Sequence, residues 1–162
     1  MNRILFFNSD GIDPRVIEEH GRLICTLSIL EWFLQEAIIL IILKREFDPS
    51  QKSDVVLADQ IFSLSFARKI DLIQKHGLLS EDLRKKLDVV RQRRNLFVHG
   101  IGLKFNAGFV LQIPGKAEQE PYTFESMSRF RNFVEDVGGN LVSEFERNGF
   151  NLKGQRMRTL IA

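Results

Sequence analysis

The sequence predicts an all-α protein, an antiparallel bundle of four to five helices with one small β-hairpin before the last helix. Apolar residues recur at intervals of three and four over long stretches, which is the spacing that places them on one side of a helix. Capping residues and glycine or proline breaks separate these stretches. A shorter apolar run, GLKFNAGFVLQI, is centred on turn-forming residues and predicts the hairpin.

Length and composition indicate one domain over residues 1–150 and a basic tail over 151–162. The chain has 162 residues, of which 44% are hydrophobic, and a net charge of +2 that gives no general argument for nucleic acid. The single cysteine, Cys25, is expected to be buried in a helix and cannot form an internal disulfide. This pattern favours a reducing, cytoplasmic setting. No cysteine or histidine cluster has the spacing of a zinc site, so we expect neither metal nor other cofactor.

The first helix is predicted from Pro14 to about residue 46, with Asp13 as its cap. The residues expected to face inward are Ile17, Ile24, Leu27, Leu34, Ile38 and Ile41. The most apolar segment, 27–43, contains Glu31 and falls short of a full bilayer span. We therefore expect a buried core helix and no membrane insertion.

Two further helical stretches follow the break at Pro49. The first covers 55–76, with an interruption near Ser63 or Ser65, and Gly77 suits its end. The second covers 81–99, between a capping Ser80 and a terminating Gly100.

The hairpin turns at 106–108, and the segment PGKAEQEPY after it is predicted to be a loop. Thr123 can cap the last helix, 124–147, whose middle is weakened by two adjacent glycines.

The segment VRQRRNLFVHG, residues 90–100, contains the candidate functional residues. Arg94 falls on the inward stripe formed by Leu83, Leu87, Val90 and Phe97. Because burying an unpaired charge costs several kcal/mol, Arg94 needs either an internal carboxylate or an anionic ligand. The internal candidate is Glu31 on the inner stripe of the first helix, which would pair with Arg94 or Arg91.

Asn95 and His99 lie one turn apart and share a face, whereas Arg94 and His99 point about 140° apart. The three side chains can border one groove from opposite sides. Arginine can hold a phosphate oxygen, histidine can move a proton, and asparagine can orient either group. The alternative is structural, with Arg94 paired inside the bundle and His99 acting only as a helix cap.

The segment RNLFVH resembles the signature of the HEPN superfamily, an arginine and a polar residue followed by a histidine near the end of a core helix. The order of helices and hairpin over residues 17–145 is also similar. This resemblance implies a helical domain that dimerises, so that two motifs line one cleft. Many members are metal-independent ribonucleases of toxin–antitoxin or phage-defence systems, and others are inactive and only bind.

The resemblance assigns catalysis to Arg94 and His99 and a supporting role to Asn95. A subclass has a tyrosine two residues after the histidine, which a nucleotidyltransferase modifies. Ile101 occupies that position here, so this regulation is not expected.

The motif helix is rich in bases, and we expect Lys86, Arg91 and Arg93 to contact RNA or, alternatively, to form a solvated face. His20 and His76 are expected at the surface or at helix ends. Two hypotheses remain: a homodimeric, metal-independent endoribonuclease with an antitoxin or other protein partner, or an inactive binding or scaffold protein that recognises RNA, a nucleotide or a protein.

Overall fold

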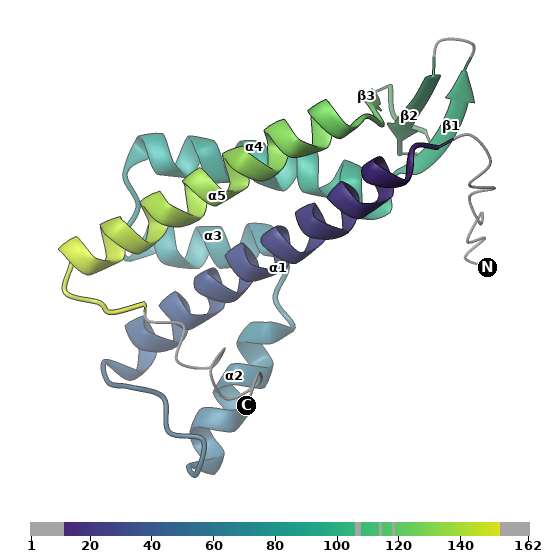
Figure 1. Cartoon of the computed structure of the whole chain (residues 1–162). Coiled ribbons are helices and arrows are strands. Elements are labelled where there is room, and N and C mark those ends of the chain that lie inside the picture. Colours follow the sequence, from purple (N-terminus) through teal and green to yellow (C-terminus); the bar gives the residue numbers. More distant parts are fainter. Residues whose placement is uncertain (1–11, 106–107, 114, 118, 153–162) are drawn as a thin grey trace.

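The computed structural model describes residues 12–105, 108–113, 115–117 and 119–152, which form five helices and three strands (Figure 1). The chain is mostly helical with a small antiparallel sheet at one end, as predicted. The elements are α1 (Pro14–Leu43), α2 (Lys52–Phe62), α3 (Phe66–Lys75), α4 (Glu81–His99), β1 (Ile101–Phe105), β2 (Gly108–Gln112), β3 (Gln119–Pro121) and α5 (Phe124–Arg147).

The helix starts are set by local capping, as the sequence indicated. The side chains of Asp13, Ser80 and Thr123 accept hydrogen bonds from backbone N–H groups in the first turns of α1, α4 and α5. Ser65 caps α3 in the same way and separates it from α2, so the expected interruption is confirmed. α1 ends at Leu43 because Lys44 takes a left-handed conformation.

The long helix α1 is the centre of the bundle. It packs against α5 along its length and also contacts α2, α3 and α4 (Figure 1). Within the described ranges it is also the one helix long and apolar enough to cross a membrane, a property that core helices share. Its inward side chains, among them Leu23, Leu27 and Leu34, pack against Phe130, Val134 and other residues of the common core.

Two expectations about the helices are wrong. Ile17 is 47% exposed, because the side of α1 that faces the core passes through Val16 and Leu23 before it reaches the predicted Leu27. Cys25 is exposed and not buried. Beyond the last helix, Leu152 is buried and belongs to the common core.

The hairpin is confirmed, but the sheet has a further strand. β1 and β2 pair antiparallel, with Ile101 opposite Gln112 and Phe105 opposite Gly108. Residues 106 and 107 of the predicted turn lie outside the described residues. β3 pairs antiparallel with β2, Val110 opposite Pro121, which corrects the prediction of a loop in this segment.

Candidate functional site

The motif helix α4 has a sharply defined end. At Gly100 a Cβ atom would lie 2.1 Å from the carbonyl oxygen of Leu96, and the Gly100 N–H donates to that same oxygen at 2.7 Å. Only glycine allows the chain to turn so closely against the last helical turn. This turn leads directly from His99 into β1 and fixes where the motif stops.

The predicted pairing of Glu31 with Arg94 is confirmed. The Arg94 guanidinium donates to Glu31 Oε2 at 2.9 Å, and it lies 5.6 Å from the centre of the Phe66 ring. Both side chains are largely covered, with Arg94 24% and Glu31 20% exposed. Arg94 therefore points toward α1, as its place on the apolar stripe predicted, while Arg91 pairs with Asp88 instead.

A second cation shares the same carboxylate. Lys69 of α3 is fully buried, and its Nζ donates to Glu31 Oε1 at 2.6 Å. It also reaches the backbone carbonyl of Phe62 at 3.4 Å. Glu31 thus joins α3 and α4 to α1, and two positive charges surround one negative charge. Lys69 is not among the site residues predicted from the sequence, although its spacing from Phe66 and Ile73 places it on the inward stripe of α3.

Asn95 and His99 are both exposed and follow each other by one turn on the outward side of α4. The structure therefore keeps these two motif residues on one surface and turns Arg94 inward. In a single chain Arg94 is brought to Glu31 and not to His99.

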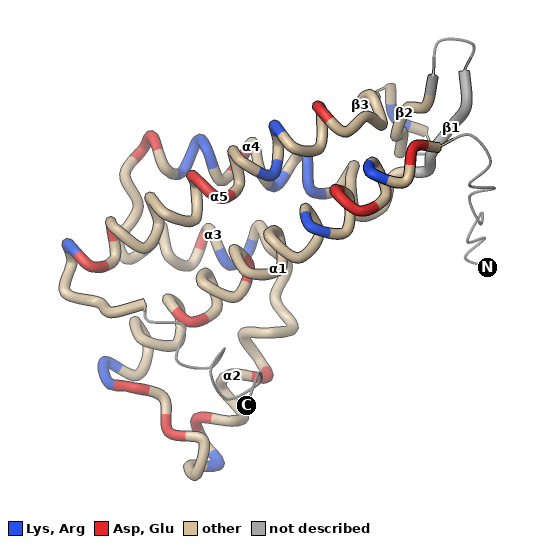
Figure 2. Tube along the Cα trace, viewed as in Figure 1, with Lys and Arg blue, Asp and Glu red and all other residues tan. Residues whose placement is uncertain are grey.

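The bases expected to contact RNA all have acidic neighbours in the same chain. Lys86 pairs with Asp82 at 2.7 Å, and Arg91 with Asp88 at 3.3 Å. Arg93 pairs with Glu120 at 3.1 Å. Acidic and basic segments alternate along α4 in Figure 2. These contacts reduce the positive field of the helix, although the two more exposed pairs, Lys86–Asp82 and Arg91–Asp88, are weak enough for phosphates to compete.

His20 is not a surface or cap residue, in contrast to His76, which caps α3. Its Nε2 lies 2.9 Å from the carbonyl oxygen of Phe97, and its Nδ1 lies 3.0 Å from the Tyr122 hydroxyl. A carbonyl only accepts, so Nε2 donates and the neutral ring accepts from Tyr122 at Nδ1. Burial raises the pKa of the Tyr122 phenol, which keeps it a donor. His20 thus anchors the last turn of α4 to α1.

A metal site or a cavity elsewhere in the molecule would be another source of chemistry besides the motif. The described residues contain no group of three or more histidine, cysteine, aspartate or glutamate side chains that could hold a metal ion. Two cavities lie at the far end of α1, and none of the motif residues is among the residues that line them. No protein-family model, no curated protein and no solved structure matches this chain.

Proposed function

We propose that this protein is a metal-independent endoribonuclease of the HEPN type, with Arg94, Asn95 and His99 of two copies lining one cleft. The observation that carries the proposal is the end of α4, where an exposed asparagine and an exposed histidine lie one turn apart beside an anchored arginine. The resemblance of RNLFVH adds the role of a cytoplasmic toxin or phage-defence component with an antitoxin or other protein partner.

The residue types fit cleavage of RNA by its own 2′-hydroxyl. A base takes the 2′-hydroxyl proton, the 2′-oxygen attacks phosphorus, and the bond to the 5′-oxygen breaks as an acid protonates that oxygen. One motif histidine per chain cannot fill both roles at once, but two copies of His99 can. Arg94 would stabilise the charge on the phosphorane oxygens, and Asn95 would orient the phosphate or a histidine.

The test is cleavage of a single-stranded RNA by purified protein in excess EDTA. We expect products with a 2′,3′-cyclic phosphate and a 5′-hydroxyl, because the motif offers nitrogen bases and cations rather than carboxylates for a metal. His99→Ala should lower the rate by about 100-fold or more. Since His99 is exposed, the variant should keep its stability within about 0.5 kcal/mol, as circular dichroism can verify.

Two controls identify the source and the nucleophile. RNA carrying 2′-O-methyl groups should resist cleavage, because the attacking hydroxyl is blocked. Equal cleavage by the wild type and His99→Ala would reveal a contaminating nuclease and contradict the proposal.

One observation favours the second candidate, an inactive binding or scaffold protein. Arg94 already has a carboxylate partner in the bundle, so a structural role accounts for its position without a ligand. Absence of cleavage across RNAs of varied sequence, together with unchanged retention of RNA by His99→Ala, would favour this candidate.

A further inference from the structure

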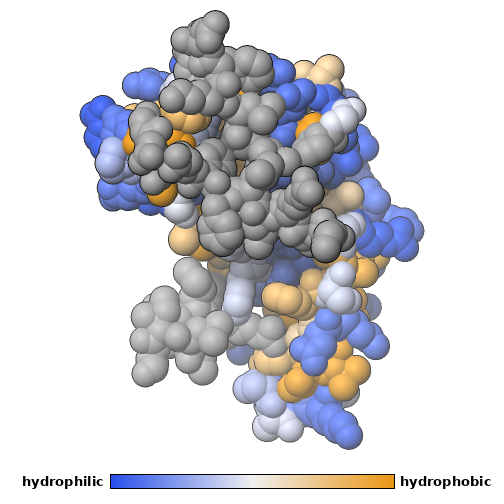
Figure 3. Space-filling view, turned by 90° about the vertical axis from the view of Figure 1, so that its right-hand side faces the viewer, coloured by the Kyte–Doolittle hydropathy of each residue, from blue (hydrophilic) through white to orange (hydrophobic). Residues whose placement is uncertain are grey.

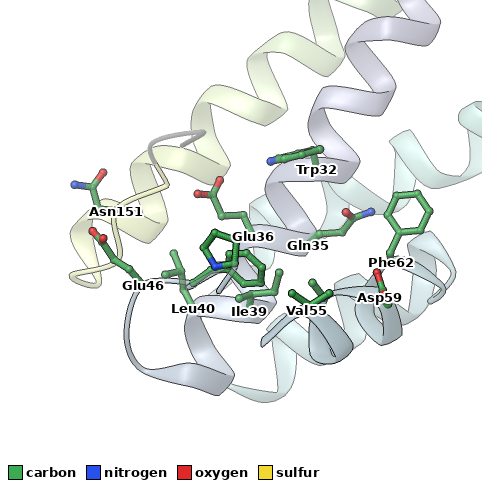
Figure 4. A pocket seen from close by; sticks show the side chains of 13 residues that line it. Trp32, Gln35, Glu36, Ile39, Leu40, Glu46, Val55, Asp59, Phe62 and Asn151 are labelled. Atoms are coloured by element: carbon green, nitrogen blue, oxygen red, sulfur yellow. The ribbon is translucent and has the colours of Figure 1, made fainter. Parts of the chain in front are cut away.

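A groove of about 620 Å³ lies between α1 and α2, at the opposite end of the molecule from the sheet (Figures 1 and 4). One wall is a single face of α1, on which Trp32, Gln35 and Ile39 follow at helical spacing. The connection from α1 to α2 closes one end with Phe47 and Pro49. The volume is within the range of about 300–1,000 Å³ that is usual for small-molecule sites.

The opposite wall is a single face of α2. Val55, Ala58, Asp59 and Phe62 follow at intervals of three and four, so this helix turns an apolar face with one carboxylate toward α1. Phe62 is 69% exposed, although its ring borders the groove. Hydrophobic surface gathers at this lower end of the molecule in Figure 3. Large exposed aromatic side chains beside a cavity are typical of binding sites.

The charged side chains in the described lining of the groove are all acidic. Its described lining includes three carboxylates, those of Glu36, Glu46 and Asp59, and neither lysine nor arginine. Glu36 already interacts with a partner of its own, so the acidic character that a ligand would meet comes from Glu46 and Asp59. In Figure 4 Asp59 lies beside Phe62 at one end, and Glu46 lies at the other. Such a site attracts cations and disfavours carboxylate or phosphate ligands, including RNA.

We propose that this groove binds an organic cation with an apolar body, an alkyl- or arylammonium compound. The apolar body would cover Ile39, Val55 and Ala58, and the ammonium group would lie between the Asp59 carboxylate and the Phe62 ring. A carboxylate pairs with the charge, and an aromatic face attracts a cation further. This proposal is separate from the ribonuclease, because neither the motif residues nor RNA take part in it.

Trp32 provides the readout, since it is the only tryptophan of the chain and borders the groove. Three probes with the same chain length would be titrated below their aggregation concentrations: octylammonium, 1-octanol and octanoate. We expect a saturable change of tryptophan fluorescence, with octylammonium binding most tightly, octanol more weakly and octanoate most weakly. Added salt should reduce the preference for octylammonium over octanol.

A pair of matched variants tests whether the Asp59 carboxylate binds the ammonium group. Asp59→Asn should weaken octylammonium binding by about threefold, the effect of losing a partly exposed ion pair, and leave octanol binding unchanged. The control is Asp136→Asn, which removes an exposed carboxylate from α5 and should change neither affinity. Phe62→Ser should weaken both probes, because it removes part of the apolar wall.

Three results would overturn the proposal. Octanoate could bind as tightly as octylammonium, or Asp59→Asn and Asp136→Asn could have the same effect. The third is a fluorescence response that appears only after Arg156→Ser and Arg158→Ser are introduced, which would identify the chain's own basic C-terminal residues as the occupant.

Discussion

At the scale of single residues, Glu31 is the carboxylate that links three helices of the bundle. Its two carboxylate oxygens receive Lys69 at 2.6 Å and Arg94 at 2.9 Å, from two different helices. The two cations are not equivalent, since Lys69 is fully buried and Arg94 is 24% exposed. Water can solvate Arg94 if Glu31 is lost, whereas Lys69 would remain a charge without a carboxylate inside the core.

Glu31→Gln should therefore lower the free energy of unfolding by about 3 kcal/mol, the lower end of the range for breaking a buried pair. Arg94→Met should cost about 1 kcal/mol or less, because Glu31 keeps its bond to Lys69. Urea unfolding followed by circular dichroism measures both. Equal costs for the two variants would show that Lys69 does not depend on Glu31.

The residues of the site could be predicted where the spacing of neighbouring apolar residues shows that a side chain faces the core. The place of Arg94 on an apolar stripe already required an acid, and Glu31 was the acid on the inner face of the first helix. Lys69 had the same kind of signal but was overlooked. The role of His20 could not be predicted, because its partners lie 77 and 102 residues away in the sequence and only the packed bundle brings them together.

At the scale of elements, local signals predicted the helices and failed for the third strand. Caps and turn residues act within a few positions, so the starts of α1, α4 and α5 could be recognised in the sequence. β3 consists of Gln119, Glu120 and Pro121, which have little preference for strands. Its conformation comes from pairing with β2, a tertiary contact.

The start of α2 should make stability depend on pH. Asp54 is buried and accepts two hydrogen bonds from Arg45, at 2.7 and 2.8 Å. These bonds, with the backbone N–H of Asp48, lower the Asp54 pKa from 3.8 to about 2. As pH falls below about 4 the unfolded chain takes up a proton that the folded chain refuses, so this contribution is complete above about 5 and is lost toward pH 2.

Asp54→Asn should accordingly unfold at lower urea concentration than the wild type at pH 6, and the difference should shrink as pH falls from 4 to 2. When Arg45→Gln is present in both proteins, the difference in unfolding between the protein with Asp54 and its Asp54→Asn variant should change less between pH 4 and 2. The reason is that Arg45→Gln removes the guanidinium that lowers the Asp54 pKa. A constant difference between wild type and Asp54→Asn down to pH 2 would contradict the assignment.

At the scale of the whole molecule, the outward side of α4 decides whether the proposed site can be complete. Val98 is 40% exposed and points within about 60° of Asn95 around the helix. The dimer that the proposed site requires would cover Val98 together with Asn95 and His99. The outward side of α4 is therefore where we expect a second copy to bind, which would bring two copies of His99 together.

Light scattering at high micromolar concentration should then give twice the chain mass of 18.8 kDa. Val98→Asp places a charge in the expected interface and should yield monomers that no longer cleave RNA, even though their own His99 is intact. The control is Val56→Asp, which changes a valine of similar exposure, 46%, on α2 and should leave both mass and cleavage unchanged. A monomeric wild type that cleaves RNA would show that one chain holds a complete site. A Val98→Asp dimer would place the interface on another face of the molecule.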